Sequence, residues 1–253
     1  MLALLAMVAN ITFAQETVDN IAAFKALDKN TTAVLTLKEA QVVYKNEFKS
    51  KSGSTTTEYY VRDASGAIQF YNTGLNLAEG QVLNGTIEGK YSPYNGTPEL
   101  AKTDNTSAEN LTITEGTVTP TSVTVADLQD DKYICDLIVV KGKLTEEESG
   151  NYKNYYVSDG DNKVMVYDKF KTGVTIPSDG NEYEVKGVLV SAKLSDNIVY
   201  EISPLSINTA TGINTINTTV STENGVLYNV AGQRVNNDYK GLVIMNGKKL
   251  LKK

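Results

Sequence analysis

Histidine and tryptophan are absent from the 253 residues of this chain, and cysteine occurs once, as Cys135. Without histidine, Ser-His-Asp and Cys-His nucleophile activation, histidine acid–base catalysis and histidine-ligated zinc are excluded. A single cysteine excludes an intrachain disulfide framework and a cysteine-rich metal site. We therefore expect a protein that is not an enzyme and that carries no metal and no cofactor.

Positive charge is also scarce in most of the chain. The formal net charge is −4 over residues 15–117, −6 over residues 118–208 and +4 over the tail from residue 209. Binding to nucleic acid without sequence preference normally requires a basic stripe along the protein surface. The acidic body therefore argues against nucleic acid as a partner.

The beginning of the chain is apolar but short. Residues 2–14 read LALLAMVANITFA and are followed by Gln15-Glu16. This run is too short to span a bilayer, and Thr12 and Ala14 are small enough for a signal-peptidase site. No Lys or Arg precedes the run, so we expect Met1 to lie within a longer signal peptide. Residues 1–14 are thus predicted to direct export, with no transmembrane helix in the mature chain.

The body of the chain contains the same unit twice. Pairs of similar segments recur at a spacing of about 100 residues, which indicates duplicated domains rather than a solenoid. The pairs are EYYVRD at 58–63 and NYYVSD at 154–159, IQFY at 68–71 and VMVY at 164–167, and LNGTI at 83–87 and VKGVL at 185–189. A short helix is predicted before each copy, at 18–27 with Thr17 as its cap and at 125–128, followed by long strands at 34–43 and 135–144.

Short alternating segments separated by Asp-Gly, Asn-Gly and Ser-Gly turns predict an all-β sandwich or a small barrel. One long strand, a hairpin, a fourth strand interrupted by Gly85 or Gly187 and a closing fifth strand suit a five-stranded OB barrel. Both units resemble the OB-fold modules of secreted Bacteroidetes proteins, in YVRDASG at 60–66 and YVSDGD at 156–161. The resemblance implies two tandem OB-like five-stranded barrels, at 17–117 and 118–208. A generic β-sandwich is the alternative.

A Thr/Asn-rich linker at 209–224 leads into a compact run of β signals, residues 225–253, with the sequence GVLYNVAGQRVNNDYKGLVIMNGKKLLKK. Ala231-Gly232 forms a turn, and Asn246-Gly247 between two apolar runs is a strong hairpin signal. This segment resembles the C-terminal sorting domains of the type IX secretion system of Bacteroidetes. The resemblance implies a small C-terminal β module, the secretion machinery as a partner, and a secreted or outer-surface location. A solubilising terminal hairpin is the alternative.

Strand alternation predicts which side chains are available to a ligand. Tyr59, Val61, Ile68 and Phe70 in the first copy, and Tyr155, Val157, Val164 and Val166 in the second, are expected to point into the barrels. The outer face of strands two and three is the usual OB ligand platform, and tyrosine rings there can stack on sugars or bases. The candidate ligand-binding residues are therefore Tyr60, Arg62, Gln69, Tyr71, Tyr156, Ser158, Met165 and Tyr167. As an alternative, these tyrosines stabilise the sheet or cover the neighbouring barrel.

Two acidic motifs are interpreted as structural. Asp159-Gly160-Asp161-Asn162 resembles the start of a calcium loop, but Phe170 occupies the closing position, so a hairpin turn is expected. Glu146–Glu148 lies between the first two strands of the second barrel and is interpreted as a solvated loop rather than a glycosidase carboxylate pair.

These features together predict an exported, non-enzymatic extracellular or cell-surface binding or adhesion protein whose ligand is an oligosaccharide or a peptide. A structural or spacer module without its own ligand, and an OB fold that binds nucleic acid, are the alternatives.

Overall fold

The computed structural model describes residues 16–49, 53–210, 227–236, 238–245 and 248–252. The predicted signal peptide and nearly all of the predicted linker lie outside these ranges. The chain divides into two compact units, Met1–Ala210 and Thr211–Lys253. No helix in the described ranges combines the length and apolar character that a membrane span would need.

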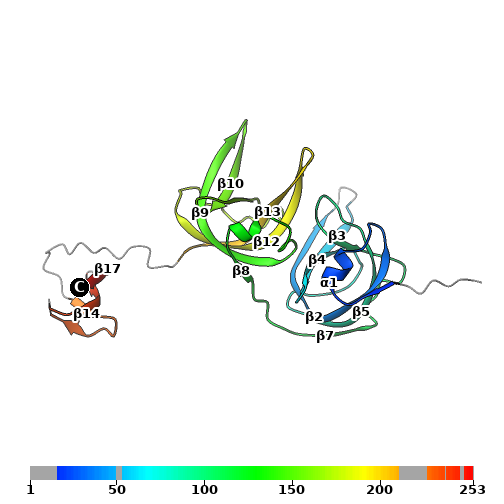
Figure 1. Cartoon of the computed structure of the whole chain (residues 1–253), viewed down its shortest axis with the longest axis horizontal. Helices are drawn as coiled ribbons and strands as arrows, with labels where there is room; N and C mark the ends of the chain where they lie inside the picture. The colour runs from blue at the N-terminus through cyan, green and yellow to red at the C-terminus, as the bar shows by residue number, and fades with distance from the viewer. Residues whose placement is uncertain (1–15, 50–52, 211–226, 237, 246–247, 253) are drawn as a thin grey trace, which may run out of the picture. The chain divides into compact units, whose positions relative to one another are not determined.

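A closed five-stranded barrel forms the first half of the larger unit (Figure 1). Its strands are β2 (Thr32–Lys49), β3 (Thr55–Asp63), β4 (Gly66–Tyr71), β6 (Glu99–Ala101) and β5 (Val82–Tyr91). They pair in that order, and β5 returns to β2 to close the barrel. Two short strands add to it, β1 (Glu16–Val18) beside β2 and β7 (Leu111–Thr114) beside β5.

The second half repeats this connectivity. Its strands are β9 (Leu137–Ser149), β10 (Tyr152–Ser158), β11 (Lys163–Val166), β13 (Asn197–Thr209) and β12 (Glu182–Leu194), with β8 (Thr121–Val123) beside β9. In both barrels the third strand pairs in parallel with the fifth, and the first pairs with the fourth. This is the OB order, so the prediction of two OB-like barrels is confirmed and the sandwich alternative is wrong.

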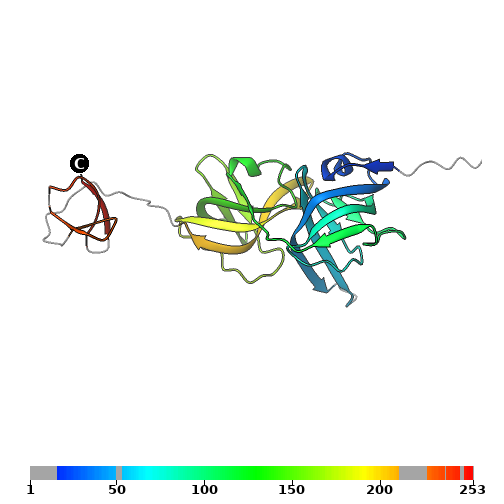
Figure 2. The ribbon, with the colours of Figure 1, turned by 90° about the horizontal axis from the view of Figure 1, so that it is seen from below.

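Each barrel encloses its own apolar core, filled by the side chains that strand alternation assigned to the inside. Tyr59, Val61, Ile68 and Phe70 are buried in the first core. Val157, Val164 and Val166 are buried in the second, with Tyr155 packed against them. Helix α1 (Ile21–Lys25), dark blue in Figure 2, adds Ile21 and Phe24 to the first core, and the 3-10 turn η1 (Ala126–Leu128) adds Leu128 to the second.

The helix predicted at 18–27 begins later than expected, at Ile21. Thr17 and Val18 pair in parallel with Val34 and Leu35 of β2, so their backbone is extended and cannot begin a helix. The cap is Asn20 instead, whose side-chain oxygen accepts a hydrogen bond from the backbone N–H of Ala23 at 2.9 Å.

Two further boundaries differ from the predictions. Strand β9 begins at Leu137, because Cys135 has a φ of +67° and lies in the turn before it. Glu146–Glu148 forms the end of β9 rather than a loop. Strands β9 and β10 remain paired up to the hairpin that joins them. Two of these carboxylates form ion pairs with lysines, Glu146 with Lys153 of β10 at 2.7 Å and Glu147 with Lys163 of β11 at 2.6 Å.

A third apolar cluster joins the two barrels. It contains Val43, Tyr60 and Ala67 from the first barrel with Ile134, Cys135, Leu137, Val188 and Val190 from the second. Polar bonds flank it, including Arg62 Nη1 to Asp136 Oδ1 at 2.9 Å and the hydroxyls of Thr97 and Ser191 at 2.7 Å. The barrels therefore share a packed interface, and a cleft beside it has a wall on each barrel.

The smaller unit forms a four-stranded sheet of β14 (Leu227–Asn229), β15 (Arg234–Val235), β16 (Gly241–Met245) and β17 (Lys248–Lys252). Leu227, Val243 and Leu250 form its core. The turn at Ala231-Gly232 is present, since Asn229 Oδ1 accepts from the backbone N–H of Ala231 at 3.0 Å and Gly232 has a φ of +78°. The predicted Asn246-Gly247 turn lies outside the described residues, although the strands on either side of it pair antiparallel.

Candidate binding cleft between the barrels

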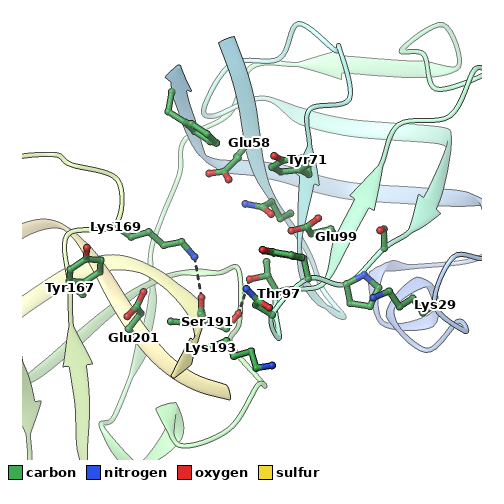
Figure 3. A pocket seen from close by; sticks show the side chains of 17 residues that line it. Lys29, Glu58, Tyr71, Thr97, Glu99, Tyr167, Lys169, Ser191, Lys193 and Glu201 are labelled. Carbon is green, nitrogen blue, oxygen red and sulfur yellow. Dashed lines mark hydrogen bonds between the residues drawn. The ribbon is translucent and has the colours of Figure 1, made fainter. Parts of the chain in front are cut away.

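An open cleft of about 610 Å³ lies between the two barrels of the larger unit (Figure 3). Three tyrosines, three glutamates and three lysines line most of it: Tyr71, Tyr94, Tyr167, Glu58, Glu99, Glu201, Lys29, Lys169 and Lys193. Phe48, Gln69 and Ser191 also reach its surface. The cleft thus combines flat rings with charged and amide groups, as binding sites for polar organic ligands do.

Two of the tyrosines occupy corresponding positions in the two barrels. Tyr71 ends β4 and Tyr167 follows β11, at matching places in the repeated unit. Their side chains are 36% and 57% exposed. Duplication of the sequence has therefore placed one accessible ring on each barrel, and both rings line the same cleft. Tyr94, 66% exposed, comes from a tight turn in which its backbone pairs with Thr97.

Two of the glutamates are related in the same way. Glu99 on β6 pairs with Gln69 on β4, and Glu201 on β13 pairs with Met165 on β11, so the two carboxylates have the same register. The residues that follow them, Leu100 and Ile202, are fully buried in the two cores. Alternation then turns the glutamates to the outer surface of each barrel, where the cleft lies.

Both carboxylates are nearly buried, with residue exposures of 9% for Glu99 and 4% for Glu201. Burial, and secondarily the neighbouring Glu58, raises the pKa of Glu99 from 4.5 to about 7, although Lys169 and Lys29 oppose the shift. Burial also raises the pKa of Glu201, again against the effect of Lys169. In both cases removal from water outweighs the nearby positive charge.

Glu58 and Gln69 are fixed by a hydrogen-bond network below the cleft. Asn46 Nδ2 donates to Glu58 Oε2 at 2.8 Å, and Gln69 Nε2 donates to the hydroxyl oxygen of Tyr60 at 2.9 Å. That hydroxyl in turn donates to Glu58 Oε2 at 3.4 Å. Burial raises the pKa of Tyr60 well above its ordinary value, so this hydroxyl stays protonated and keeps its donor role.

Two of the three lysines of the cleft contact other groups. Lys169 Nζ donates to the backbone carbonyl of Ser191 at 3.1 Å. Lys193 Nζ lies 3.9 Å from Asp196, at the exposed end of β12. Figure 3 shows Lys169 extended towards Ser191, with Glu201 and Tyr167 on the same side of the cleft.

Of the eight candidate ligand-binding residues, three line this cleft: Gln69, Tyr71 and Tyr167. A fourth, Met165, lies in a neighbouring hollow of about 400 Å³ that shares Tyr167 and Glu201 with the cleft. The structure therefore brings together residues of both barrels that the sequence placed on two separate platforms.

The placement of Tyr60 and Arg62 on an accessible platform needs correction. Both point away from the first core, but the second barrel covers them. Tyr60 is 1% exposed and packs its ring 5.5 Å from that of Phe170. Arg62 Nη1 bonds to Asp136 and also to Thr121 Oγ1 at 2.7 Å. The alternative interpretation, in which a tyrosine covers the neighbouring barrel, fits Tyr60.

Tyr156 and Ser158 do not line the cleft. The ammonium group of Lys163 lies 4.5 Å from the centre of the Tyr156 ring, and Ser158 Oγ donates to the carbonyl of Lys143 at 3.5 Å. Glu99, Glu201 and Tyr94 were not among the predicted site residues. The available sequence signal was a glutamate that precedes a core residue in each closing strand, in Pro98-Glu99-Leu100 and in Tyr200-Glu201-Ile202.

The remaining acidic motif is a turn. Asp159 Oδ1 accepts from the backbone N–H of Asn162 at 3.0 Å and closes the hairpin between β10 and β11. Across the described part of the chain, no three His, Cys, Asp or Glu side chains are grouped so that they could hold a metal ion. Cys135 is fully buried, and burial raises the pKa of its thiol.

No family model matches this chain, and no curated protein matches it. Among solved structures, it is similar to a murine DNA-binding protein bound to double-stranded DNA, with 11% identity, a TM-score of 0.36, and coverage of 73% of this chain and 100% of that one. It is also similar to the tetrameric p202 HIN2, with 13% identity, a TM-score of 0.35, and coverage of 69% and 91%. A replication protein A heterotrimer bound to single-stranded DNA gives 10% identity, a TM-score of 0.24, and coverage of 76% and 69%.

Proposed function

We propose that this chain is an exported, non-enzymatic binding protein that holds an oligosaccharide in the cleft between its two barrels. The observation that carries the proposal is the pair Tyr71 and Tyr167, one accessible ring from each barrel lining a single cleft. Tyrosine rings stack on the apolar faces of sugars, and the amide of Gln69 and the surrounding carboxylates can bond to sugar hydroxyls.

The charges of the cleft favour a sugar over a polyanion. Glu58, Glu99 and Glu201 lie on the surface that a ligand would contact, and both barrel segments carry net negative charge. Carboxylates accept hydrogen bonds from hydroxyl groups but repel phosphate oxygens. An oligosaccharide therefore makes use of the groups that a nucleic-acid backbone would have to avoid.

Single-stranded nucleic acid is the second candidate. Exposed tyrosines beside Lys29, Lys169 and Lys193 are the observation in its favour, because bases stack on aromatic rings and phosphates bind lysine. Two of the structures named above contain DNA, which makes nucleic acid the class to test beside sugars.

A glycan array probed with the full chain tests the proposal. We expect the variant Tyr71→Ala/Tyr167→Ala to lose at least about tenfold in affinity, because stacking on two rings is removed. Tyr156→Ala is the matched control, since Tyr156 lies outside the cleft, and it should bind as the unmodified chain does. Recovery of the bound oligosaccharide at its original length would support the non-enzymatic role.

The other outcomes are distinct. A gel shift with single-stranded DNA that weakens steeply with salt would favour nucleic acid. Binding to extended peptides alone would favour a peptide ligand. No binding to any of these would favour a spacer role.

We also propose that the smaller unit directs the chain to the secretion machinery. Its support is the sequence resemblance, together with an independent core of Leu227, Val243 and Leu250 that makes it a separate unit. A chain lacking residues 225–253 should stay inside the cell on fractionation. The variant Val243→Asp, which places a charge in that core, should fail in the same way. Unchanged delivery to the surface would contradict a sorting role.

A further inference from the structure

We propose that the cleft selects an oligosaccharide that carries protonated amino groups, with Glu99 and Glu201 as the carboxylates that bind them. This rests on the proposed oligosaccharide binding and specifies the chemical class of the sugar. The two carboxylates lie on opposite walls of the cleft, Glu99 on β6 and Glu201 on β13 (Figure 3).

Both carboxylates lack a hydrogen-bonding partner among the described residues. They are at least nine-tenths buried, with exposures of 9% and 4%, and both border the cleft. In the part of the chain that the structure describes, no donor bonds to either carboxylate, whereas Glu58 beside them has two partners. Among the described residues, Thr73 Oγ1 is the only fully buried side-chain oxygen or nitrogen without a partner, so the oxygens of these two carboxylates remain accessible from the cleft.

The lysines of the cleft do not fill the role of such a partner, and Lys29 acts on Glu99 only electrostatically. Lys169 acts electrostatically on both carboxylates, but its Nζ donates to the carbonyl of Ser191. Lys193 lies beside Asp196 instead. Within the described ranges, no ion pair joins either carboxylate to a cation. Two acceptor sites therefore remain open towards a ligand.

Aromatic rings lie near these two carboxylates in the lining of the cleft. An ammonium group is attracted to the face of an aromatic ring as well as to a carboxylate. Each barrel supplies one such pair at matching positions, Tyr71 with Glu99 and Tyr167 with Glu201. A neutral hydroxyl would leave the charge of an ionised carboxylate uncompensated. A protonated amine satisfies the charge, the hydrogen bond and the ring together.

The experiment compares two tetramers of the same sugar, glucosamine with free amines and its fully N-acetylated form, by calorimetry on the full chain at pH 6.5. We expect the free-amine tetramer to bind at least about tenfold more tightly, a difference of about 1.4 kcal/mol. The double variant Glu99→Gln/Glu201→Gln should lose this preference, because it weakens binding of the free-amine tetramer more than binding of the N-acetylated one. Glu109→Gln, an exposed glutamate outside the cleft, is the matched control and should keep the preference.

Equal binding of the two tetramers would overturn the inference and leave oligosaccharide binding in place. A free-amine preference that survives in the double variant would overturn the role of the two carboxylates. If neither tetramer binds, the inference is overturned, whether or not the chain binds tetralysine. If, in addition, no other glycan on the array binds, the proposed function is overturned as well. A melting curve for each variant establishes that it is folded.

Discussion

Glu99 shows how burial sets the chemistry of a single side chain. Its carboxylate lies in a cleft bordered by Glu58, and its pKa of about 7 reflects lost hydration that Lys169 and Lys29 do not replace. Near neutral pH it exists in both protonation states. A bound ligand that changes its surroundings would therefore change its protonation.

Glu99 should make stability depend on pH. Because its pKa rises from 4.5 in the unfolded chain to about 7 in the folded one, the folded state holds its proton more tightly. Its contribution is fully present below pH 4.5 and is lost as the pH rises through 7. Glu99→Gln should therefore melt higher than the unmodified chain at pH 8 and equally at pH 4.5.

The expected difference at pH 8 is about 2–4 °C, or about 1 kcal/mol, because the open cleft partly screens the charge. Thermal melts of the two chains at pH 4.5, 6 and 8 measure it. Glu109→Gln is the control for loss of an exposed carboxylate. A difference between Glu99→Gln and the unmodified chain that stays constant across this range would contradict the assigned cause.

At the scale of the strand, a glycine marks the bend in each barrel. Gly85 in β5 and Gly187 in β12 lie beside register shifts in their ladders. Gly85 has a φ of +127°, and a Cβ there would collide with the backbone carbonyl of Asn110. The chain can pass this point only without a side chain, in agreement with the predicted glycine interruption of the fourth strand.

Gly85→Ala should destabilise the first barrel by at least about 2 kcal/mol, since it adds a clash with backbone to the strain of a positive φ. Gly180→Ala is the matched control: Gly180 has a φ of +75°, but a Cβ there meets nothing within 4 Å. The control should cost only about 1 kcal/mol. Urea unfolding measures the loss of stability in both variants. Equal losses would show that the structure shifts to relieve the clash at Gly85.

Strand pairing also explains which boundaries the sequence predicted well. The long strands and hairpins follow from alternation of apolar residues, which each strand carries within itself. The start of α1 and the length of β9 do not follow from this alternation, because both depend on pairing with other segments of the chain. Thr17 is extended since it pairs with Val34, and Glu147 belongs to a strand since Asn154 lies opposite it.

At the scale of the whole molecule, the interface between the barrels decides whether the cleft exists. Arg62 of the first barrel bonds to Asp136 and Thr121 of the second, and its Nη2 donates to the carbonyl of Thr119 at 3.0 Å. Burial raises the pKa of Asp136 even beside Arg62, so the ion pair only partly offsets lost hydration. Removal of the guanidinium would leave that carboxylate without its main partner.

Arg62→Ala should therefore lower the free energy of unfolding by about 2–3 kcal/mol, because it leaves a buried charge unpaired. It should also weaken ligand binding, since the walls of the cleft lie on different barrels. Lys141→Ala removes an exposed ion pair with Glu184, whose side chains are 59% and 41% exposed, and should cost less than about 0.5 kcal/mol. Urea unfolding and glycan binding of the two variants would separate the cases, and similar costs would argue against a structural role for Arg62.

The amino-acid sequence by itself determined the duplication and the inward or outward direction of the side chains along the repeated strands, and it favoured the OB order of strands that the pairing confirms. Those properties follow from local alternation and from turn residues, which act over a few positions. Only the tertiary structure decided which outward residues a ligand can reach. Packing of one barrel on the other buried Tyr60 and partly covered Arg62, and it brought Tyr71, Tyr167, Glu99 and Glu201 to one cleft. Contacts between segments about 100 residues apart depend on how two complete surfaces fit, and no local pattern encodes that fit.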